Sequence, residues 1–178
     1  MRKINFFNII LELIVILGSI VIGVTILTYI YQHEYYNKIL IALIVLAVGL
    51  IGLTEFFTLK FAIRFRSIQN AVGSILLVAL GLVFLLVKLE MKQICLIWGI
   101  SNIVLAVIHI TTCVLNILRK PLINGVRTIL NVLLIVFSII LMIKNIDFLN
   151  SFLIFLGISL LVEAAILMVE FIIERYQN

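Results

Sequence analysis

Six long apolar stretches, each about the length that crosses a lipid bilayer, occupy nearly all of this 178-residue chain. A membrane-spanning helix needs about 20 mostly apolar residues. We place the six spans at residues 9–31, 39–59, 71–87, 94–118, 126–143 and 148–173. Hydrophobic residues make up 65% of the chain and charged residues 12%, against roughly 45–50% and 25% in soluble domains. The sequence therefore predicts an all-α integral membrane protein, with six transmembrane helices in one domain over residues 1–178.

The positions of lysine and arginine predict how the chain is oriented in the membrane. The termini and the loops after the second and fourth spans hold nine of these residues, and the other three loops hold four. Because cytoplasmic loops are rich in Lys and Arg, both termini should lie in the cytoplasm. The nine are Arg2, Lys3, Lys60, Arg64, Arg66, Arg119, Lys120, Arg127 and Arg175, and the four are Lys38, Lys88, Lys92 and Lys144. With the basic residues in loops, the net charge of +5 predicts contact with anionic membrane lipid, and no nucleic acid.

The three outward loops are short and predict three hairpins. They cover residues 32–38, 88–93 and 144–147. Loops of this length should hold each odd span antiparallel to the next even span. The expected architecture is three tandem antiparallel hairpins in one bundle, all pointing the same way.

A weak internal repeat accompanies the hairpins. One glycine recurs in each even span, at Gly49, Gly99 and Gly157, and residues 49–55 match residues 157–163 with glycine and glutamate both in register. Because the hairpins share one orientation, the axis of a repeat of this kind should run along the membrane normal.

Small and polar residues at helical spacing predict the faces by which the spans associate. Lipid tails are as apolar as leucine, so membrane helices associate where small residues allow close approach or polar groups form hydrogen bonds. The residues expected to pack helices are Gly49, Gly52, Gly81, Gly99, Asn102, Ala106 and Gly157. In the fifth span Asn124, Asn131, Ser138 and Asn145 recur at intervals of seven, and Pro121 lies in the loop before that span.

Four ionisable residues lie within the predicted spans: Glu12, Glu55, His109 and Glu163. Such groups usually face the interior of a bundle or a water-filled cavity. In one interpretation, Glu55, His109 and Glu163, backed by Asn131, form a proton-accepting cluster in a cavity open to the cytoplasm. In the other, Glu12 and Glu55 reach the membrane interface, while His109 and Glu163 form hydrogen bonds between helices. The sequence leaves both open.

No spacing of reactive side chains indicates an enzyme. The chain has two histidines, His33 and His109, and one aspartate, Asp147, so neither a zinc hydrolase motif nor a pair of catalytic aspartates can form. Cys95 and Cys113 fall on one span and lie too far apart for a disulfide. We therefore predict a non-enzymatic protein with no catalytic residue, no metal site and no cofactor.

Two segments resemble the repeated two-helix unit of the HdeD-like acid-resistance membrane proteins. They are residues 133–169, LLIVFSIILMIKNIDFLNSFLIFLGISLLVEAAILMV, and residues 77–108, LVALGLVFLLVKLEMKQICLIWGISNIVLAVI. The resemblance implies a small six-span protein of the bacterial inner membrane with both termini inside and a role in surviving acid. It supplies no catalytic residue, and the proline that the family often has in its outward turns is missing here.

These observations leave more than one function open. The leading hypothesis is a non-enzymatic bacterial inner-membrane protein that acts in acid or envelope stress. The alternatives are a small transporter, a proton or ion conductor, and the substrate-binding subunit of a membrane transporter. The outward loops are too short to enclose a ligand as a lid. The oligomeric state, including a homo-oligomer, is likewise left open.

Overall fold

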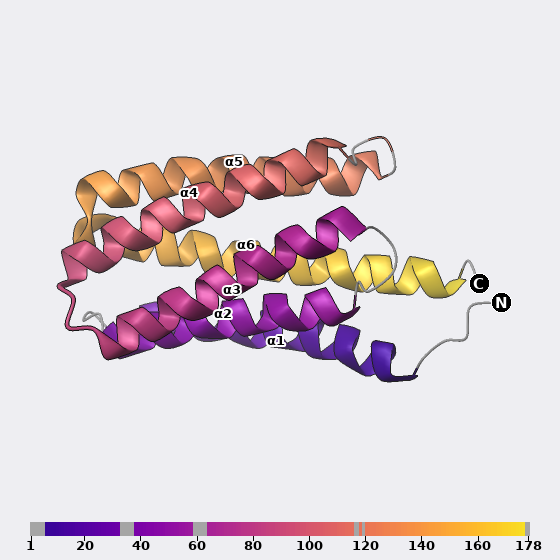
Figure 1. The fold of residues 1–178 in the computed structure, drawn as a ribbon, viewed down its shortest axis with the longest axis horizontal. Helices are drawn as coiled ribbons and strands as arrows, with labels where there is room; N and C mark the ends of the chain where they lie inside the picture. The colour runs from indigo at the N-terminus through magenta and orange to yellow at the C-terminus, as the bar shows by residue number, and fades with distance from the viewer. Residues whose placement is uncertain (1–5, 33–37, 59–63, 116–117, 119, 177–178) are drawn as a thin grey trace.

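The computed structural model describes residues 6–32, 38–58, 64–115, 118 and 120–176, which form six α-helices and no strand (Figure 1). The helices are α1 (Phe6–Gln32), α2 (Lys38–Thr58), α3 (Arg64–Leu86), α4 (Met91–Leu115), α5 (Pro121–Lys144) and α6 (Ile146–Tyr176). At one end of the bundle α1 begins, α5 begins at Pro121 and α6 ends. We call this the Pro121 end, and the end where α5 meets α6 the Asn145 end.

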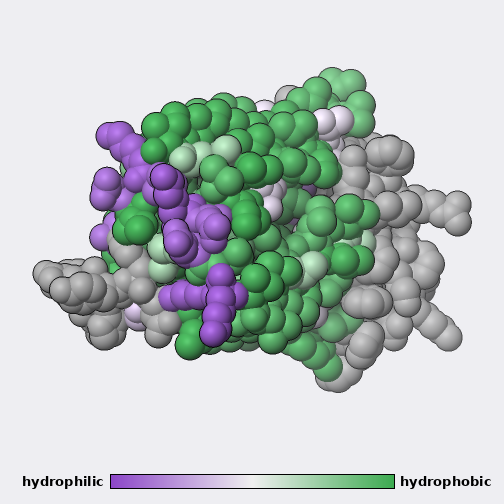
Figure 2. Space-filling model, turned by 60° about the vertical axis from the view of Figure 1, so that its left-hand side comes forward, coloured by the Kyte–Doolittle hydropathy of each residue, from purple (hydrophilic) through white to green (hydrophobic). Residues whose placement is uncertain are grey.

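Four helices are long and apolar enough to cross a bilayer: Ile9–Ile30, Met91–Leu115, Pro121–Lys144 and Ile146–Ile173. The described parts of α2 and α3 contain the shorter apolar helices Lys38–Thr54 and Ala71–Leu86. Large apolar side chains are exposed along the outside of the bundle, and Figure 2 shows hydrophilic residues gathered toward the Asn145 end of one face. An apolar exterior of this extent suggests a membrane protein.

Two helix boundaries differ from the prediction around α5. The helix begins at Pro121 rather than at residue 126. Proline suits this position because the backbone N–H that it lacks would have no partner in the first turn, and because its fixed φ is that of a helix. The predicted four-residue turn over 144–147 is a single residue, Asn145, with φ 51°. Asparagine tolerates this left-handed region, and its backbone N–H donates to the carbonyl of Leu141 at 2.7 Å. The described part of α4 ends at Leu115, and Leu118, at the predicted end of the fourth span, lies in a turn.

The most extensive helix contacts differ from those expected of three simple hairpins. α2 packs most closely along α3, α4 along α5, and α1 along α6. The hairpin partners α1 and α2, and α5 and α6, also pack together, whereas α3 and α4 contact each other little. A short loop fixes where two helix ends meet, but small residues on the helix faces decide how far along their length the helices touch.

The glycine of each repeat accounts for this pattern. A methyl group at Gly49 of α2 would lie 2.7 Å from the backbone nitrogen of Val78 in α3. One at Gly99 of α4 would lie 3.1 Å from the carbonyl oxygen of Ser138 in α5, and one at Gly157 of α6 would lie 3.2 Å from that of Gly23 in α1. Each glycine thus packs its even helix against the next odd helix, and the last contact returns to α1.

The remaining residues expected to pack helices either lie at close contacts or are buried between helices. In the seam between α2 and α3, a methyl group at Gly81 would lie 2.8 Å from Cβ of Leu46, and Gly52 lies against the hydroxyl of Ser74. Asn102 and Ala106 are buried on the inner face of α4.

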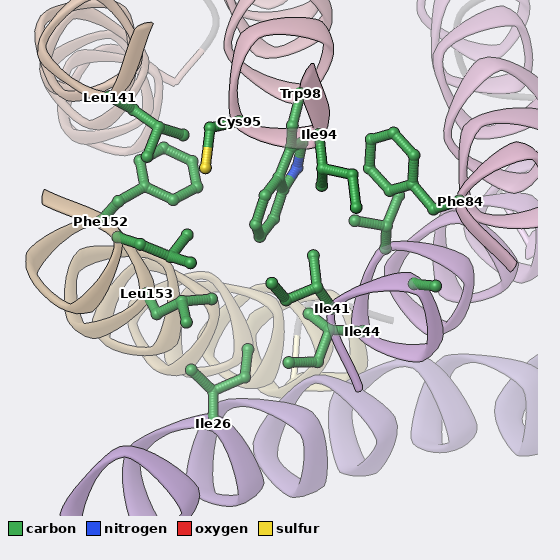
Figure 3. Close-up of a cluster of buried hydrophobic side chains, with 13 residues drawn as sticks. Ile26, Ile41, Ile44, Phe84, Ile94, Cys95, Trp98, Leu141, Phe152 and Leu153 are labelled. Carbon is green, nitrogen blue, oxygen red and sulfur yellow. The ribbon is translucent and has the colours of Figure 1, made fainter. Parts of the chain in front are cut away.

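All six helices meet in an apolar core at the Asn145 end. Trp98 of α4 is buried near its centre, with its ring edge against Phe152 of α6 at a centroid distance of 5.0 Å (Figure 3). The remaining core side chains include Ile26, Ile41, Ile44, Phe84, Ile94, Cys95, Leu141 and Leu153. These residues come from the second half of the odd helices and the first half of the even ones. The bundle is therefore tightly closed at the Asn145 end.

We expect Gly49→Ala to destabilise the protein by about 1–3 kcal/mol, because the methyl group would overlap the backbone of α3, which cannot move aside as a flexible side chain can. Gly125→Ala is the matched control, since a methyl group there would meet nothing within 4 Å. The measurement is the free energy of unfolding in detergent micelles. Equal stability of the two variants would show that the contact between α2 and α3 does not depend on Gly49.

Candidate functional site

A chain of alternating charges links α5 and α6 at the Pro121 end. Arg127 donates from Nε and Nη2 to Oε1 of Glu163, at 2.9 and 2.6 Å, and from Nη2 to Oε2 of Glu170 at 3.1 Å. Lys120 donates from Nζ to Oε1 of Glu170 at 2.8 Å. Arg127 is buried, with a side chain only 7% exposed. A guanidinium can be buried in this way because its planar fork of donors matches carboxylate oxygens.

Local sequence places these groups on facing surfaces. Because α5 begins at Pro121, Arg127 lies in the second turn of the helix, on the same face as Asn124 and Asn131. Glu163 and Glu170 are seven residues apart on α6, a spacing of two turns that keeps both on one side. α5 and α6 meet at Asn145 and diverge toward the Pro121 end, so the ion pairs bridge a widening gap (Figure 1).

A cavity of about 210 Å³ occupies the space between α4, α5 and α6. Its apolar wall includes Leu130, Leu134 and Phe155, and Phe155 stacks on Phe137 at a centroid distance of 4.5 Å. The polar lining consists of His109, Thr112, Cys113, Arg127, Asn131, Ser159 and Glu163. Along α6, Phe155 lies toward the Asn145 end of this cavity and Glu163 toward the Pro121 end. The ion pairs therefore lie where the cavity approaches the Pro121 end.

A second cavity of about 190 Å³ shares His109, Leu160 and Glu163 with the first. Its other walls come mainly from α1, α2 and α3, including Ser19 and Ser74. His109 and Glu163 thus stand between two cavities. A third, apolar groove of about 350 Å³ lies between α3 and α4, where those helices contact each other little.

The structure brings together three of the four residues of the predicted polar cluster. His109, Asn131 and Glu163 line the first cavity, from three different helices. Glu55 belongs to α2, and its side chain lies outside the described residues. Glu163 also makes a polar contact between helices, so the cavity and the interhelical pairing, which the sequence offered as alternatives, occur at the same residue.

Sequence reasoning missed Arg127, which it assigned to a loop as an orientation signal. That assignment is wrong, because Arg127 is a buried residue within α5. Pro121 was the available signal, since a helix that starts there includes Arg127 on its polar face.

The arrangement provides polar groups for binding rather than a set of metal ligands. Among the described residues, no three His, Cys, Asp or Glu side chains lie close enough to hold a metal ion. Cys95 and Cys113 are both buried, and neither forms a disulfide. Comparisons of the chain with protein-family models, with curated proteins and with solved structures give no match.

We expect Arg127→Met to reduce the free energy of unfolding by about 3–5 kcal/mol, because it leaves Glu163 facing the cavity without its buried counter-charge. Lys120→Met is the matched control. It removes a cation that also pairs with Glu170, but from a side chain 45% exposed, where an ion pair contributes less than about 1 kcal/mol. Unfolding measured in the same detergent compares the two, and losses of similar size would contradict a structural role for the buried bridge.

Proposed function

We propose that this protein is a non-enzymatic bacterial inner-membrane protein that crosses the bilayer six times and holds a small solute in the cavity at its cytoplasmic end. The observation that carries the proposal is the contrast between the two ends of the bundle. The core around Trp98 closes the Asn145 end, whereas both polar cavities and the ion pairs lie toward the Pro121 end. A cavity of this form suits capture from one side of the membrane.

The distribution of Lys and Arg supports the placement of the Pro121 end in the cytoplasm. Apart from the buried Arg127, eight of the 13 Lys and Arg residues belong to the termini, to the two connections at the Pro121 end, or to the adjoining ends of helices. Positive residues concentrate on the cytoplasmic side of bacterial membrane proteins. With the Pro121 end in the cytoplasm, the closed core around Trp98 faces the outside.

Transport of the bound solute is the second candidate, favoured by the widening gap between α5 and α6. Among the described residues, side-chain ion pairs bridge that gap at the Pro121 end, and ion pairs can exchange partners without repacking a core. Passive conduction of ions receives less support, because a conducting path would have to pass through buried side chains such as Trp98 and Phe152.

The resemblance to HdeD-like proteins supports a physiological role in acid or envelope stress. A strain that lacks the gene should survive acid challenge less well than its parent, and the intact gene should restore survival. Unchanged survival together with unchanged membrane permeability would remove the stress role and leave the solute-binding proposal to be judged separately.

Thiol labelling tests directly from which side of the membrane the cavity can be reached. The chain supplies its own control, because it has one cysteine in the cavity and one in the core. Cys113 lines the first cavity, whereas Cys95 is fully buried in the core. A charged, membrane-impermeant thiol reagent should modify Cys113 in inside-out vesicles and leave it unmodified in right-side-out vesicles. Cys95 should stay unmodified in both, as read by mass spectrometry of the digested protein.

Modification of Cys113 from the outer face would contradict the proposed orientation. A Cys113 that reacts in neither type of vesicle would contradict a solute-accessible cavity. A Cys113→Ala variant gives the background signal for both measurements.

A further inference from the structure

Three hydrogen-bond donors in the wall of the first cavity point to backbone carbonyls of their own helices, and Nη1 of Arg127, which has no hydrogen-bond partner among the described residues, is buried away from the cavity surface. The hydroxyl of Thr112 donates to the carbonyl of Ile108 at 3.0 Å, and the hydroxyl of Ser159 donates to that of Leu156 at 2.9 Å. The side-chain amide of Asn131 donates to the carbonyl of Arg127 at 2.8 Å. Ser159 and Asn131 therefore have oxygen lone pairs left to offer a ligand. A ligand that bonds to them has to bring the donors.

Glu163 also has a carboxylate oxygen that accepts no hydrogen bond from Arg127. Both hydrogen bonds that it accepts from Arg127 end on Oε1, which leaves Oε2 for another donor. Its side chain is 33% exposed and lines both cavities. A carboxylate oxygen at the wall of a partly apolar cavity is a strong acceptor for a cationic N–H group.

The ion pairs allow a cation to bind without leaving an internal charge unbalanced. If a ligand cation pairs with Glu163, Arg127 stays paired with Glu170, whose Oε2 lies 3.1 Å from Nη2 of Arg127. Lys120, which shares Glu170, is the most exposed member of the chain and can be solvated instead. An anion that paired with Arg127 would leave the carboxylate of Glu163 facing the cavity without a counter-charge. The free-energy cost of this unpaired charge is far larger than the cost of binding a cation at Glu163. The charges therefore favour a cationic ligand.

The remaining wall and the volume limit the ligand's size and character. Leu130, Leu134, Phe155 and Leu160 form an apolar surface opposite the polar groups. A volume of about 210 Å³ equals about seven water molecules at ~30 Å³ each. A short alkyl or aryl group attached to one charged nitrogen fits both the volume and the lining.

We propose that this cavity binds a protonated primary amine with a short apolar group, its ammonium bonded to Glu163 and its carbon atoms against Leu134 and Phe155. The inference rests on the proposed solute-binding function and adds the chemical class of the solute. An ammonium supplies three donors, which matches the free acceptors of Glu163, Asn131 and Ser159. An alkylamine is protonated at neutral pH, as the lysine side chain is.

A series of six-carbon probes tests the ligand class on the full-length wild-type protein in lipid nanodiscs. Isothermal titration calorimetry compares hexylammonium, hexyltrimethylammonium, hexanoate and hexanol, with empty nanodiscs as the reference for partition into lipid. Hexylammonium should bind at least about tenfold more tightly than the other three, because only it combines positive charge with N–H donors. Equal or tighter binding of any other probe would overturn the proposal.

Variants then locate the binding site. Glu163→Gln should weaken hexylammonium binding at least about tenfold, since it replaces a charge-assisted hydrogen bond with a neutral one. Glu90→Gln, the same change at an exposed residue beyond the far end of α3, is the matched control and should leave affinity unchanged. Hexylammonium binding that Glu163→Gln does not weaken would exclude Glu163 as the ammonium site. If that variant fails to fold, the wild-type probe series still decides the ligand class.

Labelling of Cys113 separates failure of this inference from failure of the proposed function. A cavity whose Cys113 reacts from the cytoplasmic side, but which binds no probe or prefers hexanoate, retains the solute-binding function and overturns the amine. A cavity whose Cys113 reacts from neither side overturns both.

Discussion

Close approach of helix backbones at three glycines is the constraint on which the rest of this bundle depends. In lipid, apolar helices do not gain stability by contacting one another instead of lipid unless they pack together more closely than lipid tails do. Gly49, Gly99 and Gly157 give that closeness, each against the following odd helix. Because these contacts join one hairpin to the next, they fix the positions of the three hairpins around a common axis.

This arrangement divides the bundle into two halves with different chemistry. Toward the Asn145 end, large side chains from all six helices fill the interior around Trp98 and Phe152. Toward the Pro121 end, α5 packs with α4 while α6 packs with α1, and the space between the two pairs holds polar and charged groups. Arg127 can be buried in that space because Glu163 and Glu170 both face it.

The number and approximate limits of the helices could be predicted from the apolar stretches alone, because hydropathy and length are local properties of the chain. The polar cluster could be predicted in part, since His109, Asn131 and Glu163 are unusual residues for apolar spans. Arg127 lies at the margin of the predicted fifth span and was counted with the loop; its burial is expected only once α5 begins at Pro121, which hydropathy does not reveal. Its pairing with Glu163, and the packing of even helices on the next odd ones, depend on tertiary contacts between residues far apart in sequence.

The contact between Gly23 in α1 and Gly157 in α6 closes the ring with the first and last helices of the chain. Since a chain is synthesised from its N-terminus, this face of α1 stays uncovered until α6 has been made. Glu163 and Glu170 both belong to α6, so Arg127 is also made before the two carboxylates with which it pairs. The polar interior of the bundle can therefore form only after α6 has been made and has joined the earlier helices.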